Sequence, residues 1–231
     1  MPIRASGWYE LEIDHCSFPD HLLYDQDGNI WIKAEEGGEV TIGMTSLLSA
    51  IAGKVTSARL RPVGSRIERG RSLGTLESLK FVGPIPSPLS GIVAAANSDV
   101  VKRPKLLNDA PYIEGWIAKL KPLDLKAERV FLSRAMDAAE TLKNRIAEFR
   151  VRCFKAFPDH EMYEIGTECS AVLVRLNELL ATAPVGDVVH LVTDDPTSYV
   201  EMVRWTDQTG HELVDWRQEG NLFHFIVRKN H

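Results

Sequence analysis

The sequence has 231 residues, of which 44% are hydrophobic and 26% charged, and a formal net charge of −5. This length fits one or two globular domains with a sizeable core. The negative balance provides no basic field for nucleic acid or anionic lipid, and no apolar run is long enough to cross a membrane, so neither kind of partner is expected.

The cysteines are Cys16, Cys153 and Cys169. They form no C-x-x-C pair and an odd number cannot all pair, which is typical of thiols in a reducing compartment rather than a disulfide framework. Residues 1–13 lack a charged segment followed by an apolar one, so no signal peptide is expected. Together these observations predict a cytoplasmic protein.

The N-terminal half has the pattern of short strands separated by Gly and Pro turns. A short helix is expected over residues 44–52, with Thr45 or Ser46 near its cap. The expected strands cover residues 30–33, 39–43, 55–60, 72–76 and 91–95. Such a series predicts a small sandwich or barrel.

The composition changes after Asp124, because residues 125–157 contain neither Gly nor Pro. Apolar residues recur there every three or four positions, which predicts one long amphipathic helix that links two domains. These residues are Leu132, Met136, Ala139, Leu142, Ile146, Phe149 and Cys153. Cys153 is accordingly expected in the core.

The C-terminal part predicts the order βαβαββ, which is typical of a two-layer α/β sandwich. The expected strands and helices cover residues 163–165, 170–182, 187–193, 196–205, 212–214 and 223–227. Because an Asp precedes Pro196 where a strand meets a helix, it is expected to cap that helix.

Lys80 lies between two apolar residues in Glu77-Ser78-Leu79-Lys80-Phe81-Val82, and Ser87-Pro88-Leu89-Ser90-Gly91 follows. Pro104–Trp116 reads P-K-L-L-N-D-A-P-Y-I-E-G-W, and Thr41–Thr45 reads T-I-G-M-T. Over residues 20–122 the sequence resembles the H protein of the glycine cleavage system. The resemblance implies a barrel-sandwich hybrid with lipoate amide-linked to Lys80 by a lipoate ligase or lipoyl transferase. A carrier lysine needs a protruding turn held by rigid strands, and this hairpin pattern supplies one.

Two segments depart from the H-protein pattern. His21-Leu22-Leu23-Tyr24 replaces the family's H-E-W-V, and Pro84 and Pro86 follow the lysine where the family has Asp and an aromatic residue. Both changes fall where a partner would dock, so they bear on the aminomethyl-carrying role more than on lipoylation.

A second motif is Gly166-Thr167-Glu168-Cys169, followed by Pro184-Val185-Gly186-Asp187 and Thr193-Asp194-Asp195-Pro196. Over residues 160–230 these features resemble the TusA-type sulfur carriers, which implies that Cys169 accepts a persulfide. A helix start favours a thiolate and the adjacent Glu168 opposes it, so a moderately activated thiol is expected. The family's two prolines are replaced here by Ser170 and Val172, and a buried structural thiol is the alternative.

These inferences predict an α+β protein with a lipoyl domain (1–124), a helical connector (125–158) and a TusA-like domain (159–231). It would be a carrier rather than an enzyme, and no metal-ligand pattern is present. The combination implies cytoplasmic sulfur trafficking, with a heterodisulfide-reductase-like complex or sulfurtransferases as partners. The alternatives are a glycine cleavage H protein that carries the aminomethyl group, and an interaction protein with Lys80 unmodified.

Overall fold

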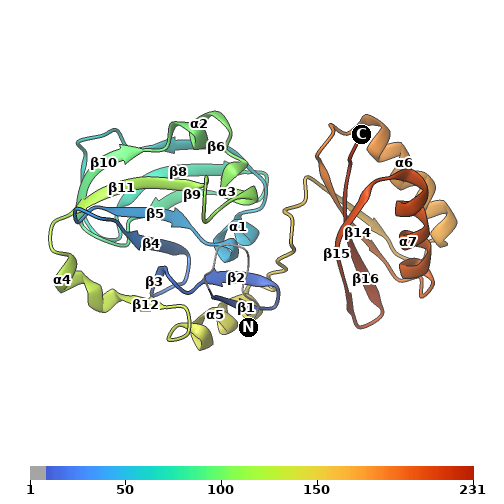
Figure 1. The fold of residues 1–231 in the computed structure, drawn as a ribbon, viewed down its shortest axis with the longest axis horizontal. Helices are drawn as coiled ribbons and strands as arrows, with labels where there is room; N and C mark the ends of the chain where they lie inside the picture. The colour runs from blue at the N-terminus through green and yellow to red at the C-terminus, as the bar shows by residue number, and fades with distance from the viewer. Residues whose placement is uncertain (1–8) are drawn as a thin grey trace. The chain divides into compact units, whose positions relative to one another are not determined.

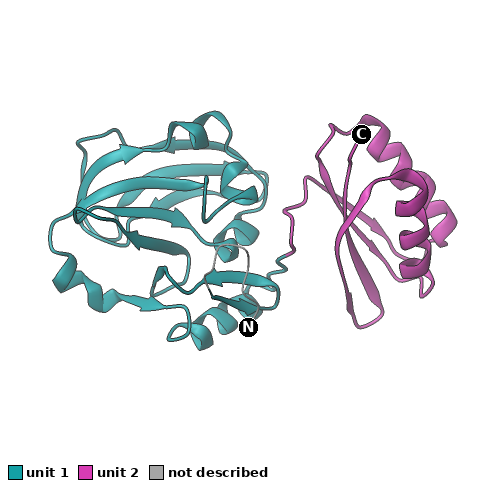
Figure 2. Ribbon diagram, in the orientation of Figure 1, with its two compact units in different colours: residues 1–153 teal, residues 154–231 magenta. Residues whose placement is uncertain are grey.

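The computed structural model describes residues 9–231, and the chain divides into two compact units, residues 1–153 and 154–231 (Figure 2). Most of the segment in which no signal peptide was expected lies outside the described residues. Each unit has a core of its own. The units are therefore described separately.

The first unit is built mainly from two sheets (Figure 1). The larger sheet has the order β12-β3-β4-β5-β11-β10-β7, and its strands are β3 (Leu23–Asp25), β4 (Ile30–Ala34), β5 (Val40–Met44), β7 (Arg66–Ile67), β10 (Gly91–Ala96), β11 (Trp116–Pro122) and β12 (Leu132–Arg134). The smaller sheet has the order β6-β8-β9, from β6 (Val55–Leu60), β8 (Ser72–Ser78) and β9 (Val82–Pro86). A separate hairpin pairs β1 (Glu10–Ile13) with β2 (Cys16–Pro19).

Short helices connect the strands of this unit. They are α1 (Ser46–Ala52), α2 (Ser98–Lys102), α3 (Leu106–Asp109), α4 (Leu125–Glu128), the 3-10 helix η1 (Arg129–Phe131) and α5 (Ala139–Glu148). Helix α1 begins as the sequence predicts, because the Thr45 hydroxyl accepts a hydrogen bond from the Leu48 N–H.

The main core of the first unit lies between the two sheets. All residues of β5 are buried, and Ile42 and Leu120 of the large sheet belong to the same cluster as Leu76 and Ile85 of the small sheet. On β8, Gly74 and Leu76 are buried whereas Thr75 between them is exposed. This alternation fixes which face of the β8–β9 hairpin meets the core and holds the hairpin rigidly. The expected sandwich of sheets in a β-rich N-terminal region is confirmed.

The expected long helix over residues 125–157 is wrong. The segment contains α4, η1, β12 and α5, and α5 ends at Glu148. Leu132 pairs with Asp25 of strand β3 and joins the main core, whereas Met136 is half exposed. Edge strand β3 offers unpaired backbone groups, and pairing with them outweighs the helical periodicity of the segment.

The expectation of three free thiols is also wrong, because Cys16 and Cys153 form a disulfide. Cys16 lies on β2, and Cys153 lies beyond α5 and not on a helix. Both are buried in a second cluster with Phe18, Trp31 and Leu142. The two cysteines are separated by 137 positions in the sequence, so only the tertiary fold brings them together.

The second unit confirms the order βαβαββ. Its elements are β13 (His160–Glu164), α6 (Cys169–Thr182), β14 (Val188–Thr193), α7 (Ser198–Thr209), β15 (Glu212–Glu219) and β16 (Leu222–Arg228). The sheet order is β13-β14-β16-β15, with β13 and β14 parallel and the remaining pairs antiparallel. Figure 1 shows α6 and α7 on one side of this sheet, and their apolar residues share a core with Leu191 and Phe225.

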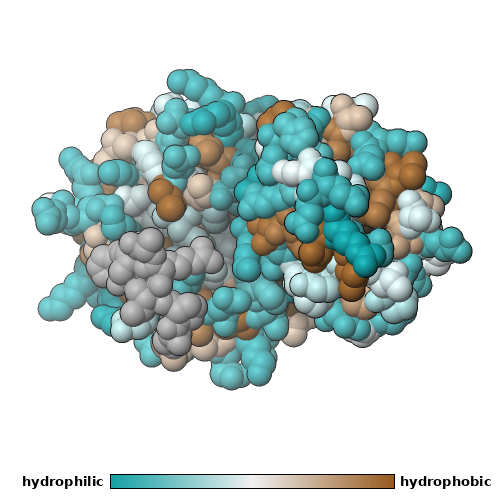
Figure 3. Space-filling view, turned by 45° about the vertical axis from the view of Figure 1, so that its right-hand side comes forward, coloured by the Kyte–Doolittle hydropathy of each residue, from teal (hydrophilic) through white to brown (hydrophobic). Residues whose placement is uncertain are grey.

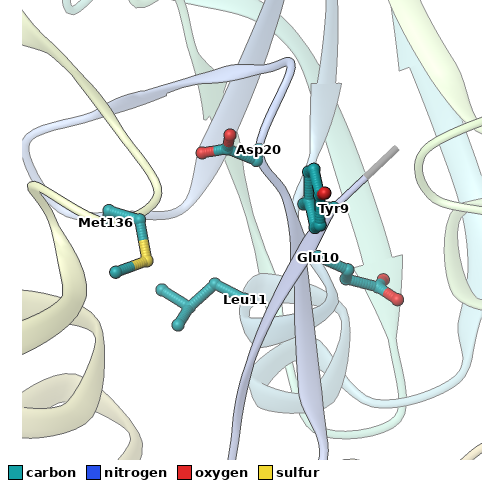
Figure 4. A pocket seen from close by; sticks show the side chains of 5 residues that line it. All are labelled: Tyr9, Glu10, Leu11, Asp20 and Met136. Atoms are coloured by element: carbon teal, nitrogen blue, oxygen red, sulfur yellow. The ribbon is translucent and has the colours of Figure 1, made fainter. Parts of the chain in front are cut away.

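The surface of the described residues includes apolar patches and a small pocket. On the face shown in Figure 3, apolar side chains gather in separate patches on a mostly hydrophilic surface. A small pocket between β1 and the segment before α5 is lined by Tyr9, Glu10, Leu11, Asp20 and Met136 (Figure 4). That lining contains neither Lys80 nor a cysteine. Within residues 9–231, no helix is both long and apolar enough to cross a membrane, and no three metal-ligating side chains are grouped to hold an ion.

Candidate functional site

Lys80 lies at the tip of the β8–β9 hairpin. Glu77 pairs with Val82, and the Ser78 N–H donates to the Phe81 carbonyl oxygen at 2.7 Å. Only Leu79 and Lys80 remain between this last pair. Both are exposed, Leu79 to 93%. The lysine therefore protrudes from a tight turn between rigid strands, as the sequence predicts.

Ser78 holds the turn from inside. Its Oγ accepts hydrogen bonds from the backbone N–H groups of Lys80, at 3.1 Å, and Phe81, at 2.9 Å. The same hydroxyl donates to the carbonyl oxygen of Ala52, the last residue of α1. One side chain thus fixes the backbone of the lysine to the end of a neighbouring helix.

The residue after α1 provides space for the lysine stem. Gly53 has φ +76°, and a Cβ added there would lie 3.4 Å from Lys80 Cδ. Asn108 fixes this corner: its Oδ1 accepts from the Val55 N–H at 2.8 Å, and its Nδ2 donates to the Gly53 carbonyl oxygen at 2.9 Å. A lysine that carries a long acyl group fits this arrangement, because the residue is exposed while its stem packs against Gly53.

Ser78, Gly53 and Asn108 position the lysine, and none of them was predicted from the sequence to do so. Two of them stand inside the quoted motifs, Ser78 beside the lysine and Asn108 in the Pro104–Trp116 segment. The spacing of those motifs was a usable signal for them. Gly53 offered none, because its role follows from the packing of Lys80 against it.

The two prolines after the lysine are explained by their place in the sheet. Pro84 and Pro86 lie on β9, which is the edge strand of the β6-β8-β9 sheet. Proline cannot donate a backbone hydrogen bond, and an edge strand has one side on which no partner strand needs that bond.

Cys169 is the first residue of α6 and is only 7% exposed. Its backbone N–H donates to Asp195 Oδ2 at 2.9 Å. Burial, followed by the charges of Asp195 and Glu201, raises the pKa of the Cys169 thiol to about 11. The pKa of this thiol is thus shifted in the direction opposite to the moderate activation expected from the helix start, because burial and the two carboxylates outweigh that effect.

Asp195 was expected to cap the second helix of this unit, but the N-cap position of that helix is Thr197. Helix α7 begins at Ser198, and Asp195 Oδ1 accepts hydrogen bonds from the N–H and the hydroxyl of Thr197 ahead of it. Its second carboxylate oxygen serves the start of α6 instead. Asp195 thus joins the entries of both helices, while neighbouring Asp194 accepts from the Gly166 N–H. Lys80 and Cys169 belong to different compact units.

Comparison with protein families identifies both parts of the chain. Residues 22–145 match the family model "Glycine cleavage H-protein", and residues 164–229 match "Sulfurtransferase TusA". The chain belongs to the glycine cleavage H-protein family. A TusA domain follows at its C-terminus. Proteins of this family are carriers, and the cofactor that they hold covalently is lipoate.

Curated relatives match the H-protein part. "Glycine cleavage system H protein 2" of Aquifex aeolicus is 38% identical over 60% of this chain and 86% of its own length. "Glycine cleavage system H protein 5" of the same organism is 39% identical over 62% and 98%. "Probable glycine cleavage system H protein 2" of Sulfolobus acidocaldarius is 38% identical over 60% and 94%. A crystal structure of an H protein from Mycobacterium marinum has 28% identity, covers 53% of this chain and 98% of its own, and gives a TM-score of 0.48.

Proposed function

We propose that the protein is a lipoylated carrier in cytoplasmic sulfur trafficking or oxidation, with lipoate attached to Lys80. The supporting observation is the joining of an H-protein domain and a TusA domain in one chain. A dithiolane arm and a sulfur-carrier domain both exchange sulfur by thiolate attack on a sulfur atom. A heterodisulfide-reductase-like complex or a sulfurtransferase is the class of partner that would supply or receive it.

The attachment at Lys80 rests on the geometry of the hairpin tip. The amine protrudes between strands that a core holds in place, and Ser78 fixes the turn. A lipoate ligase or lipoyl transferase can reach such an amine without unfolding the domain. When bound, lipoate supplies a reversible disulfide on a long arm.

Lipoylation is tested by intact mass and peptide mapping of the full chain after growth with lipoate. The lipoyl mass is expected on the Lys80 peptide and is expected to be lost in Lys80→Arg. The matched control is Lys126→Arg, which changes another exposed lysine of the same unit. A bare Lys80 in cells with working attachment enzymes would contradict the proposal.

Sulfur loading separates the roles of the arm and Cys169. We expect a sulfane sulfur donor to add mass to the protein whose lipoyl arm has first been reduced to the dithiol, because an arm thiolate attacks the donor and displaces its leaving group. Lys80→Arg and Cys169→Ser locate the adduct. Because the pKa of Cys169 is raised, its share of the adduct is expected to grow with pH. A lipoylated protein that gains no sulfur on either group would contradict the sulfur role.

The names of the relatives favour a second candidate, a glycine cleavage H protein that carries the aminomethyl group. This function predicts that the lipoylated chain supports glycine decarboxylase turnover. The altered segment His21–Tyr24 argues against it, because Leu22 stands where the family has an acid, so no carboxylate is offered to a partner there. Leu22 and Tyr24 are buried, so these two residues do not form the docking surface that was expected. A decarboxylase assay with an authentic H protein as reference decides between the two.

A further inference from the structure

The Cys16–Cys153 disulfide and the Lys80 hairpin meet opposite ends of helix α1. At the first residue of the helix, Cys153 Sγ lies 3.9 Å from the Ser46 carbonyl oxygen. At its far end, Ser78 bonds to Ala52 and Lys80 packs against Gly53. Helix α1 has seven residues, so the two sites are about 10 Å apart along its axis.

A lipoyl group on Lys80 would bring its sulfur atoms within range of this disulfide. The lysine stem and the acyl chain together comprise roughly ten consecutive covalent bonds of about 1.5 Å each. Extended, such an arm exceeds the length of α1. The disulfide is thus a bond that the reduced arm, a dithiol, can attack, and it belongs to the same compact unit as the lysine.

One sulfur of the disulfide is the more accessible. Cys153 is 7% exposed and follows α5 in a segment outside the helices and strands, whereas Cys16 is fully buried on strand β2. Segments of this kind open locally at lower free energy than core strands do. In the cytoplasmic setting proposed above, disulfides are usually catalytic or redox-sensing, which suits a bond that an internal dithiol can reach.

We propose that the Cys16–Cys153 disulfide is a second redox centre that exchanges with the reduced lipoyl arm, an inference that rests on the function proposed above. An arm thiolate attacks Cys153 Sγ, the Cys16–Cys153 bond breaks, and Cys16 leaves as a thiolate that takes up a proton. The second arm thiol then displaces Cys153, which closes the dithiolane ring and releases the Cys153 thiol. The arm loses two electrons and two protons, and the cysteine pair gains them.

The test uses the full chain, lipoylated and with the disulfide intact, and reduces only the arm with dihydrolipoyl dehydrogenase and NADH in the absence of free lipoamide. N-ethylmaleimide then traps the thiols for peptide mass analysis. We expect label on Cys16 and Cys153 in the lipoylated protein and at least tenfold less in Lys80→Arg. A labelled arm beside an intact disulfide, or equal labelling in Lys80→Arg, would overturn the exchange alone. Absence of the lipoyl mass would overturn the proposed function as well.

A trapping variant gives a second readout. Cys16→Ser leaves Cys153 as a thiol that can attack the oxidised arm, and we expect a mixed disulfide between the Lys80 and Cys153 peptides on non-reducing maps. Its yield should not depend on protein concentration, because the reaction is intramolecular. Cys169 in the same molecule is the internal control, and a crosslink to Cys169 instead of Cys153 would refute the assignment.

Discussion

Cys169 shows how burial, together with neighbouring carboxylates, outweighs a helix start. The backbone N–H at this position donates to Asp195, and the charges of Asp195 and Glu201 add to the effect of burial on the thiol. With a pKa of about 11, only about one molecule in ten thousand holds the thiolate at pH 7. At neutral pH the Cys169 thiol is therefore held in its protonated form by burial and by its carboxylate neighbours.

We expect Asp195→Asn to lower the pKa of Cys169 and to raise its alkylation rate at pH 7 severalfold, since the substitution removes a charge that opposes the thiolate. The wild-type rate should climb about tenfold per pH unit toward pH 11. Rates of iodoacetamide labelling from pH 7 to 11 measure both effects, with Asp207→Asn as the exposed control. Identical profiles for wild type and Asp195→Asn would contradict the carboxylate effect.

Asp25 predicts a pH dependence of stability in the first unit. Desolvation raises the pKa of Asp25 to about 6, although the carboxylate accepts hydrogen bonds from the Asn29 and Ile30 N–H groups. The folded state keeps this proton to a higher pH than the unfolded chain does. The protonated carboxyl therefore contributes fully to the free energy of unfolding below about pH 4, and this contribution is lost as pH rises through 6.

Asp25→Asn removes the titration but keeps an oxygen that accepts the same two bonds. Above pH 6 we expect the free energy of unfolding of the variant to exceed that of wild type by up to about 3 kcal/mol. Near pH 4 we expect the two proteins to have similar free energies of unfolding. Urea denaturation between pH 4 and 8 measures this difference. If the free energies of unfolding of wild type and Asp25→Asn changed in parallel with pH, Asp25 would not be the source of the pH dependence.

At the scale of elements, the β8–β9 hairpin depends on Ser78. Removing its hydroxyl leaves the Lys80 and Phe81 N–H groups without this acceptor, at a cost of about 0.5–1.5 kcal/mol because water can reach the exposed turn. We expect Ser78→Ala to slow the attachment of lipoate in a purified ligase assay, because the turn no longer holds Lys80 in one position.

Ser72→Ala is the matched control, since Ser72 lies on the same strand and its hydroxyl donates to the Gly74 carbonyl oxygen away from the turn. Attachment rates that fall equally in both variants would assign the effect to the strand rather than to the turn.

Local patterns explain which elements were predicted correctly. Thr45 marks the start of α1, and the alternation on β8 and the order of the C-terminal elements follow from residues close in sequence. The helix predicted over residues 125–157 was wrong because part of this segment pairs with β3, some hundred positions earlier in the sequence. The raised pKa of Cys169 was not predicted for the same reason, because only the fold brings Asp195 next to Cys169.

At the scale of the whole molecule, the disulfide closes a long loop of the first unit. Loss of such a crosslink costs roughly 2–5 kcal/mol of unfolding free energy. In Cys16→Ser we expect faster hydrogen exchange of the β4 and β5 amides, with β14 unchanged, because β14 belongs to the second unit. Cys169→Ser is the control, and exchange that accelerates equally in both units would contradict a local role.

The prolines of β9 have a further consequence for a carrier that must meet several partners in turn. An edge strand with a full row of backbone donors invites another chain to add to the sheet, which leads to fibres and insoluble aggregates. Pro84 and Pro86 remove two of those donors beside the hairpin tip. The protruding lysine thus remains available to an incoming enzyme while self-association through the neighbouring strand is discouraged.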